Sequence, residues 1–325
     1  MKNECSQILA EFSLPKCAKT DRFGVGLIHT TYLVHAGKEK FILQKMNPIF
    51  GTDILADTRA VSEFLSGQGW RVQKLLPAKN GKLFAEKNGE IWRMFTFVPG
   101  RIFESATDKN MAYEAGKILG RFHRDLLPFK HKFAKGRGGK TPASRYEKFL
   151  KVTAGKQTAE IEALKSEIAH LPEFFLPKRT RLTIMHGDPK LSNIVWNERG
   201  AKKAIALIDI DDCTNKGNTL LELGDAFRSW CGGREHDAKN TFDFGKFEAA
   251  KAGYAEGSDC LLRPNEIALL ARATKLKCLE LASRFLVDYF EDYYFGWDEK
   301  RFSSRREHNL ARAKGQVTLC KSVKL

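Results

Sequence analysis

The sequence predicts an α+β protein with two lobes, a small antiparallel β-sheet at the N-terminal end and a larger, mainly helical part after it. Three observations predict this arrangement. The chain has 325 residues, about twice the length of a typical single domain. Residues 23–98 consist mostly of short apolar runs joined by turn sequences, whereas helical periodicity dominates the later residues. Pro99-Gly100 breaks the pattern between them, so we expect lobes at residues 1–98 and 99–325.

The N-terminal lobe is predicted to contain two hairpins and one helix. The first hairpin joins Tyr32–Ala36 to Lys40–Met46 through a turn that contains glycine. The second joins Leu83–Lys87 to Glu90–Phe97 through Asn-Gly, the strongest short-range hairpin sequence. Between the hairpins, the apolar residues of Asp53–Leu65 recur at the spacing of one amphipathic helix. The lobe should therefore be a small sheet with one helix.

The C-terminal lobe combines helices with a second set of short strands. Asp108 is a candidate N-cap for the first of these helices. A long helix is expected over Asn265–Phe290, where apolar residues recur near helical spacing. Three apolar runs between these helices are predicted strands: Leu182–Met185, Ile194–Trp196 and Ala204–Ile208.

The chain is strongly basic, with 55 Lys and Arg against 39 Asp and Glu and a formal net charge of +16. Such a balance fits nucleic acid, an acidic membrane surface or an anionic substrate. The densest basic stretch is 130–140, which also holds three glycines and is either a solvated loop or a phosphate-binding element. Neither a zinc-finger nor an RNP-type aromatic pattern accompanies it, so we expect no nucleic-acid partner.

The compartment is inferred from the cysteines and the apolar runs. Seven scattered cysteines without a C-x-x-C pair argue against a zinc site or a disulfide framework and favour a reducing compartment. No apolar run reaches the roughly 18 residues of a membrane span, and the N-terminal residues lack the apolar stretch of a secretory signal. We therefore expect a soluble, cytoplasmic protein, monomeric because no coiled-coil seam is evident.

The residues that carry chemistry lie at the ends of two predicted strands. His-Gly-Asp-Pro-Lys-Leu-Ser-Asn occupies 186–193, and Ile-Asp-Ile-Asp-Asp occupies 208–212. Phosphoryl transfer needs a carboxylate that orients and deprotonates the acceptor hydroxyl, which assigns Asp188, and a cation near the migrating group, which assigns Lys190. It also needs oxygen ligands for Mg²⁺, and Asn193 and Asp209 can supply them.

These two motifs, H-G-D-x-K-x-x-N and I-D-x-D, resemble those of the aminoglycoside phosphotransferase/choline kinase family, distant relatives of the protein kinases. The chain is further similar to N-acetylhexosamine 1-kinases in six segments: 24–34, 41–50, 92–97, 223–228, 284–288 and 308–312. The resemblance implies a two-lobed, protein-kinase-like fold. It also implies an enzyme that uses ATP and Mg²⁺ to phosphorylate a small alcohol, most narrowly the anomeric hydroxyl of an N-acetylhexosamine.

The resemblance also implies nucleotide-binding positions in the N-terminal lobe. They are Gly24, Gly26, Thr30, Lys45, Glu63, Thr96 and Phe97. Lys45 would contact the α- and β-phosphates, with Glu63 as its partner on the predicted helix, although Asp53 and Asp57 are also candidates. The strand that ends at Thr96 and Phe97 would offer backbone groups to adenine.

The acceptor side is less defined by the sequence. Arg284 lies among apolar residues of the predicted 265–290 helix, and a guanidinium there suits sugar hydroxyls or a phosphate. An aminoglycoside, choline or another small alcohol is the alternative acceptor. Protein phosphorylation is disfavoured because no D-F-G or A-P-E segment follows Asp188. A non-catalytic binding module would require a decayed site, and none of the site residues is replaced.

Overall fold

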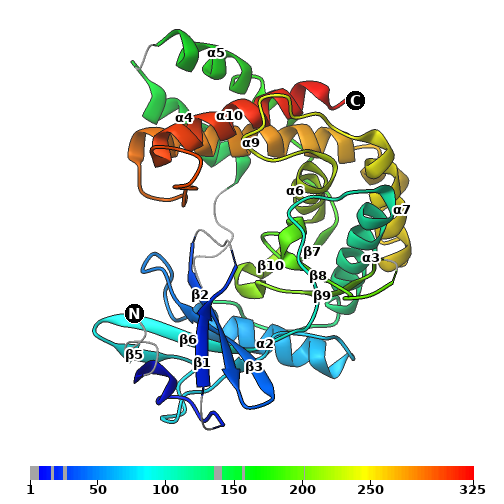
Figure 1. The fold of residues 1–325 in the computed structure, drawn as a ribbon. Helices are drawn as coiled ribbons and strands as arrows, with labels where there is room; N and C mark the ends of the chain where they lie inside the picture. The colour runs from blue at the N-terminus through cyan, green and yellow to red at the C-terminus, as the bar shows by residue number, and fades with distance from the viewer. Residues whose placement is uncertain (1–6, 16–17, 25–27, 135–140, 156–157, 201) are drawn as a thin grey trace. The chain divides into compact units, whose positions relative to one another are not determined.

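The structure is a computed structural model that describes residues 7–15, 18–24, 28–134, 141–155, 158–200 and 202–325 (Figure 1). The chain divides into two compact units. The first comprises Met1–Pro99 with His131–Ala134, and the second comprises Gly100–Lys130 with Lys135–Leu325. The first unit holds an antiparallel sheet and the second is mainly helical, which confirms the predicted α+β class. The return of residues 131–134 to the first unit was not predicted.

The sheet of the first unit has the strand order β1-β2-β3-β6-β4, with β5 paired to β6, and every pair is antiparallel. Between β3 and β4 the chain forms one helix, α2, as the amphipathic pattern predicted. The elements are β1 (Ala18–Arg22), β2 (Thr30–Ala36), β3 (Glu39–Lys45), α2 (Ile54–Gly67), β4 (Leu75–Leu76), β5 (Ala85–Lys87) and β6 (Glu90–Thr96).

The two faces of this sheet carry separate apolar clusters. On one face, Leu43 clusters with Ile8 of the N-terminal segment. On the other face, Ile42 clusters with Ile54 of α2. Side chains alternate between the two faces along a strand, so residues of β3 an even number of positions from Leu43 share the face of Leu43, and the others share the face of Ile42. Each residue of β6 lies on the same face as the β3 residue with which it pairs. The face that α2 covers is called the α2 face below.

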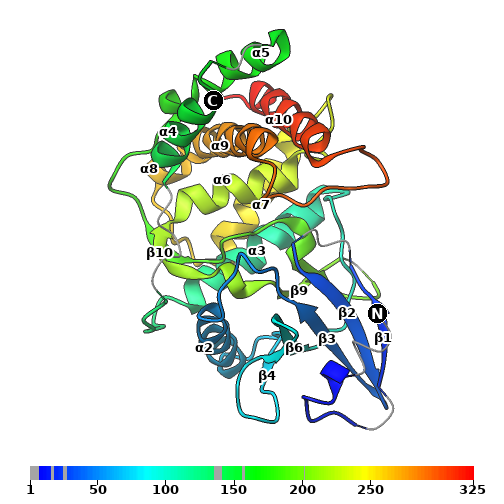
Figure 2. The same cartoon turned by 90° about the vertical axis from the view of Figure 1, so that its left-hand side faces the viewer.

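The second unit is built around a long central helix, α9, on which α4, α6 and α10 pack (Figure 2). Within its described residues, two small sheets are antiparallel pairs, β7 with β10 and β8 with β9. The helices are α3 (Lys109–Asp125), α4 (Pro142–Thr153), α5 (Ala159–Ile168), α6 (Thr219–Cys231), α7 (Phe244–Gly257), α8 (Pro264–Ile267), α9 (Leu270–Glu291) and α10 (Arg305–Ser322). The remaining elements are the 3₁₀ turns η1 (Leu171–Phe174), η2 (Leu191–Asn193) and η3 (Ile210–Asp212), and the strands β7 (Leu182–Met185), β8 (Ile194–Trp196), β9 (Ala204–Leu207) and β10 (Thr214–Asn218).

Helices α3 and α7 approach each other unusually closely because glycines line their contact. A Cβ atom added at Gly253 would collide with the backbone carbonyl of Tyr113, and one added at Gly116 would collide with that of Ala250. Asp108 caps α3, as predicted, by accepting a hydrogen bond of 2.9 Å from the backbone N–H of Met111. The close α3–α7 contact fixes the residues that lie beneath the site.

The single helix predicted over 265–290 is in fact two. The short α8 ends at Ile267, a turn follows at Ala268 and Leu269, and α9 begins at Leu270. The buried carboxylate of Glu266 accepts hydrogen bonds from the backbone N–H groups of Arg181 (2.5 Å) and Arg263 (3.0 Å). These bonds anchor α8 independently of α9, which a periodicity count along the sequence cannot show.

None of the helices in the described residues is both long enough and apolar enough to cross a membrane.

Candidate active site

Two loops of the second unit meet at the predicted catalytic residues. The first follows β7 and holds residues 186–193, and the second follows β9 and holds residues 209–212. His186 Nε2 donates to the carbonyl of Ile208 at 3.1 Å, and the N–H of Ile208 donates to the carbonyl of Asn193 at 2.9 Å. Burial lowers the pKa of His186, so its role is that of a neutral ring that connects the two loops.

Gly187 is required where these loops cross. Its φ of 90° lies in the region that favours glycine, and a Cβ atom there would collide with the backbone carbonyl of Asp212. The H-G-D sequence is therefore a close crossing of two backbones, which brings the residues after Gly187 next to those after β9.

Asp188, Lys190 and Asn193 form one hydrogen-bonded group. Lys190 Nζ lies 2.5 Å from Asp188 Oδ2, and Asn193 Nδ2 donates to the backbone carbonyl of Asp188 at 2.9 Å and to Oδ2 at 3.2 Å. The Asp188 side chain is 33% exposed, so an acceptor can reach it. Burial opposes the charge of Lys190, but Asp188 and Asp209 outweigh it and raise the pKa of Lys190. Lys190 is therefore a permanent cation beside the candidate base.

The carboxylate of Asp209 lies near those of Asp188, Asp211 and Asp212. Its backbone is left-handed, with φ 63° and ψ 42°, and begins the turn η3. Burial, followed by the negative charge of Asp211 and then of Asp188 and Asp212, raises the pKa of Asp209 to about 7. Because like charges this close oppose ionisation, a divalent cation is the natural counter-charge for the group.

The donor set fits Mg²⁺. Asn193 uses its Nδ2 towards Asp188, and its Oδ1 accepts no hydrogen bond within the described part of the chain. One amide oxygen and one carboxylate are hard ligands, and Mg²⁺ commonly takes only one or two protein carboxylates besides water and phosphate oxygens. The described residues contain no cluster of three or more His, Cys, Asp or Glu in metal-binding geometry, and this ligand set does not call for one.

A buried chain of polar groups supports the first loop from below. Glu222 of α6 accepts the N–H of Gly187 at 2.7 Å with one oxygen and contacts His123 Nε2 at 2.6 Å with the other. His123 Nδ1 in turn lies 2.9 Å from the hydroxyl of Tyr254 on α7. Although burial favours the neutral acid, the contact with His123 keeps the pKa of Glu222 below its usual value. Glu222 is a positioning residue that the sequence analysis missed; its only signal was an acid inside an apolar helical run.

Two further side chains of α6 hold the same loop. Trp230 Nε1 donates to the carbonyl of Pro189 at 2.8 Å, and the hydroxyl of Ser229 accepts the N–H of Leu191 at 3.4 Å. Residues 187, 189 and 191 are thus each bonded to α6, so the backbone on both sides of Asp188 and Lys190 is fixed.

The structure corrects the expected environment of Lys45. In the register of β3 and β6, Lys45 is paired with Trp92, on the face opposite to α2. Its Nζ lies 2.5 Å from Glu90 Oε1 and 5.9 Å from the centre of the Trp92 ring. Glu63 is 59% exposed and pairs instead with Arg59, one helical turn earlier. The expected Lys45–Glu63 pair is therefore wrong, because the two residues lie on opposite sides of the sheet.

The α2 face instead carries Gln44 and Arg93, which are directly paired in the register. The Nε and Nη2 of Arg93 donate to Gln44 Oε1 at 3.0 and 2.8 Å, and Gln44 Nε2 donates to Thr31 Oγ1 at 3.2 Å. Arg93 is fully buried, with its guanidinium 5.0 Å from the Phe95 ring. It is a buried basic residue on the side of α2, and the sequence analysis did not single it out.

The other acids considered for Lys45 have different roles. Asp57 is buried on α2 and accepts His131 Nε2 at 2.7 Å and the N–H of Ala134 at 3.0 Å, which holds residues 131–134 against the first unit. Asp53 is the N-cap residue of α2.

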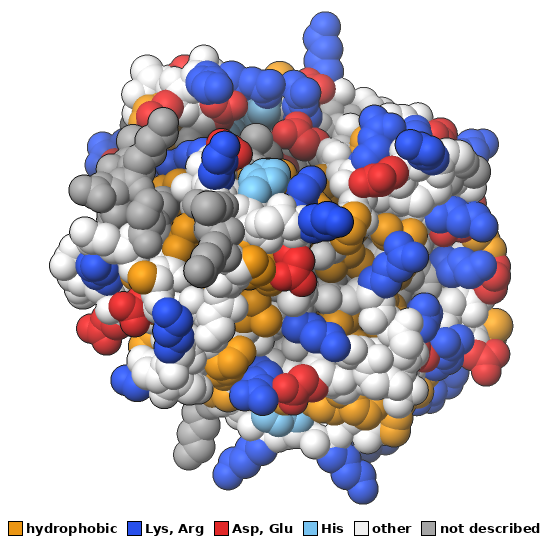
Figure 3. Space-filling model, turned by 60° about the horizontal axis from the view of Figure 1, so that its bottom comes forward, with side chains coloured by type: hydrophobic (Ala, Val, Ile, Leu, Met, Phe, Trp, Pro, Cys, Tyr) orange, Lys and Arg blue, Asp and Glu red, His pale blue; other side chains and the backbone are white. Residues whose placement is uncertain are grey.

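The remaining predicted nucleotide positions that the structure describes lie at or near strand ends. Gly24 has φ 77°, Thr30 begins β2, and Gly26 falls outside the described residues. The N–H of Thr96 donates to the carbonyl of Lys74 at 2.9 Å, and the N–H of Phe97 donates to that of Lys40 at 3.3 Å. Residues 135–140 of the basic stretch also lie outside the described part. On the face shown in Figure 3, Lys and Arg side chains are interspersed with Asp and Glu and do not gather into one patch.

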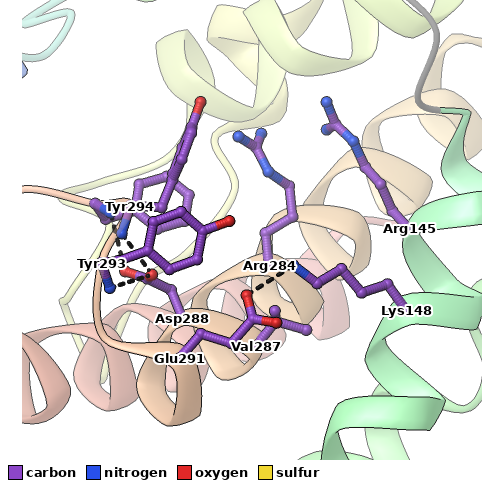
Figure 4. Close-up of a pocket in the computed structure, with 9 residues that line it drawn as sticks. Arg145, Lys148, Arg284, Val287, Asp288, Glu291, Tyr293 and Tyr294 are labelled. Atoms are coloured by element: carbon purple, nitrogen blue, oxygen red, sulfur yellow. Dashed lines mark hydrogen bonds and ion pairs between the residues drawn. The ribbon is translucent and has the colours of Figure 1, made fainter. Parts of the chain in front are cut away.

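Arg284 lines a cavity of about 130 Å³ in the second unit (Figure 4). The cavity lies among α4, the C-terminal part of α9 and the loop after it. Arg284 is half-buried, with its guanidinium carbon 5.8 Å from the centre of the Tyr294 ring and 5.2 Å from that of Phe295. The remaining lining residues are Arg145, Lys148, Val287, Asp288, Glu291 and Tyr293.

An Asp-Lys-Asn loop after one strand and a carboxylate cluster after another, in a chain of this architecture, define a kinase-like phosphotransferase. The model of the phosphotransferase enzyme family matches residues 19–257, and the chain belongs to this family. It is therefore a small-molecule phosphotransferase with an alcohol group as acceptor, as the motifs predicted.

Solved structures support the fold over nearly the whole chain. A microcompartment-associated aminopropanol kinase has a TM-score of 0.72 and 17% identity, with 99% of each chain covered. An amicoumacin kinase in complex with AMP-PNP and Ca²⁺ has a TM-score of 0.64 and 14% identity, with 97% of this chain and 92% of that one covered. The choline kinase of Cryptosporidium parvum Iowa II has a TM-score of 0.62 and 11% identity, with 97% and 94% covered.

Proposed function

We propose that the protein is an ATP- and Mg²⁺-dependent sugar kinase that transfers the γ-phosphoryl group to a sugar hydroxyl, most narrowly the anomeric hydroxyl of an N-acetylhexosamine. The observation that supports phosphoryl transfer is the contact of Asp188 with Lys190 and Asn193, in loops that are bonded to the Asp209 loop. The AMP-PNP bound to the similar amicoumacin kinase supports ATP as donor.

Each of these residues has one task in the transfer. Asp188 orients the acceptor hydroxyl and takes its proton as the new oxygen–phosphorus bond forms and the bond to the β-phosphate oxygen breaks. Lys190 offsets the negative charge of the transferring group. Asn193 and Asp209 would hold Mg²⁺, and the ion would supply positive charge near the phosphates. Glu222, Ser229 and Trp230 keep the loop in this geometry without touching the reactants.

On the first unit, we propose Arg93 in place of Lys45 as the basic residue that supports the nucleotide phosphate site. Because Arg93 is fully buried, it acts through the half-buried Gln44, which it orients. Lys45 points away from the α2 face and already contacts Glu90, whereas Arg93 is bonded to Gln44. Arg93→Gln should raise the KM for ATP at least about tenfold, roughly 1.4 kcal/mol. The matched variant Lys45→Gln should change it less than about twofold. The measurement is the initial rate as a function of ATP concentration, and the reverse order of the two effects would restore Lys45 to the phosphate site.

The Arg284 cavity is proposed as part of the acceptor site. Tyr293 and Tyr294 present ring surface beside a guanidinium with five donors, a combination that suits a polyhydroxylated ring. A cationic amino alcohol would meet the guanidinium of Arg284 here, which has no ion-pair partner among the described residues, and this disfavours choline and aminoglycosides as acceptors.

A panel of acceptors tests the proposed function. N-acetylglucosamine, N-acetylgalactosamine, glucose, glucuronate, choline, kanamycin and homoserine are each incubated with ATP and Mg²⁺, and ADP release is measured. We expect turnover with at least one sugar, at a kcat/KM at least about tenfold above that of choline or kanamycin. Turnover restricted to the cationic acceptors would exclude a sugar kinase while leaving the phosphotransferase class intact.

A further inference from the structure

The cavity at Arg284 contains two cations that are already paired. Arg145 of α4 forms an ion pair with Glu280, a buried residue of α9. Lys148, one turn later on α4, contacts Glu291 at 2.7 Å. The charges of Arg145 and Lys148 are therefore each compensated by a carboxylate of α9.

The remaining carboxylate of the cavity, Asp288, is also occupied. It accepts the N–H groups of Tyr293 (3.1 Å), Tyr294 (2.8 Å) and Phe295 (2.9 Å), as Figure 4 shows. Asn309 Nδ2 of α10 donates to it at 2.9 Å. Four donors converge on this buried carboxylate, so its charge serves to shape the loop after α9, and it forms no ion pair with Arg284 among the described residues.

Arg284 is the cation that remains. It makes no hydrogen bond or ion pair with any residue that the structure describes, and its contacts are the faces of Tyr294 and Phe295. Its guanidinium extends in the same direction as that of Arg145 (Figure 4). Burial lowers the pKa of Arg284 and the charge of Arg145 lowers it further, while Tyr294, Glu280 and Asp225 oppose this lowering only in part. A half-buried cation beside a second cation is unfavourable unless an anion binds between them.

We propose that the acceptor carries an anionic substituent, a carboxylate or a phosphate, which Arg284 binds in this cavity together with Arg145. The inference rests on the proposed function, because it names the class of sugar that the site takes: an acidic one. A guanidinium matches both anions through two parallel N–H groups. A cavity of about 130 Å³ has room for such a group and part of a ring, and Tyr293, 55% exposed, offers the ring a surface.

Acceptors matched in all but charge provide the test. The kcat/KM of the wild-type enzyme is compared for glucuronate against glucose, and for N-acetylglucosamine 6-phosphate against N-acetylglucosamine. We expect the acidic member of at least one pair to be preferred at least about tenfold, and the pair that shows the preference tells a carboxylate from a phosphate. Equal turnover of both members in both pairs would overturn the inference and leave the sugar kinase in place, whereas no turnover of any sugar would overturn both.

Variants at Arg284 identify the source of the preference. Arg284→Gln, which keeps hydrogen-bond donors but removes the charge, should abolish the preference by raising the KM for the acidic sugar at least about tenfold, with the KM for ATP unchanged. Arg284→Lys should retain part of it, and this variant decides the question if Arg284→Gln melts at a markedly lower temperature. The matched control is Lys151→Gln, an exposed residue one turn beyond Lys148 on α4, which should behave as wild type. An equal loss for the neutral and acidic sugars in both Arg284 variants would contradict the inference.

Discussion

Asp188→Asn is expected to lower kcat by about a thousandfold or more while the protein stays folded. A carboxylate that removes the acceptor proton contributes between about 10² and 10⁴ to the rate, and an amide cannot accept that proton. Asn is nearly the same size as Asp, so the bond from Asn193 to the backbone carbonyl of residue 188 survives. The KM for ATP should change little, since Asp188 is assigned to the acceptor. The expected loss of activity is therefore a decrease in kcat.

The measurement is the steady-state rate with the best acceptor of the panel, together with the melting temperature. Asp259→Asn is the matched control, because Asp259 is exposed in the turn after α7 and its positive φ of 53° suits Asn equally well. The control should keep wild-type kinetics. A kcat for Asp188→Asn within tenfold of wild type would mean that another group takes the proton.

The sequence analysis grouped the candidate residues of the second unit, and the structure brings them together, because their arrangement is local. Asp188, Lys190 and Asn193 lie within six residues, and their spacing alone brings them to one short loop. The turn sequences and the Pro99-Gly100 break are equally local. Each of these features depends on neighbours in the chain, which is what a sequence shows directly.

The sequence analysis failed where the position of a side chain depends on packing between distant parts of the chain. Lys45 and Gln44 are adjacent in the chain, yet a shift of one residue moves a side chain to the other face of a sheet. Only the register with β6 shows that Gln44 and Arg93 share the face of α2. Glu222 is identified by contacts with residues 35 positions before it in Gly187 and 99 before it in His123. The pairing of Arg145 with Glu280, which leaves Arg284 as the surplus cation, spans 135 residues.

The second large effect concerns Asp209, whose substitution should remove activity and stabilise the protein in the absence of metal. Asp209→Asn should lower kcat at least about a hundredfold, because it removes a carboxylate that we propose as a ligand of Mg²⁺. In the metal-free protein, by contrast, the same carboxylate is forced to ionise near Asp211 and Asp188, which raises its pKa to about 7. An ordinary Asp has a pKa of about 3.9 in an unfolded chain.

The sign of the pH dependence follows from these two values. Between about pH 4 and pH 7 the folded state holds a proton on Asp209 that the unfolded state has released, so the contribution of this group to stability falls as the pH rises through that window. Above pH 7 the full penalty is present. In EDTA, Asp209→Asn should therefore melt several degrees above wild type at pH 8, and the difference should vanish towards pH 4.

The response of the melting temperature to Mg²⁺ distinguishes this explanation from a general improvement in packing. Added at pH 8, Mg²⁺ should raise the melting temperature of the wild-type protein, because it supplies the counter-charge that the carboxylates lack, and should leave Asp209→Asn nearly unchanged. Asp237→Asn, an exposed position of the same unit, is the control and should respond to Mg²⁺ as wild type does. A variant that is stabilised equally at pH 4 and pH 8, or that responds fully to Mg²⁺, would show that Asp209 neither bears this strain nor binds the metal. If Asp209→Asn loses both the pH dependence of its stability and the response to Mg²⁺, then Asp209 destabilises the metal-free site and also binds the ion required for catalysis.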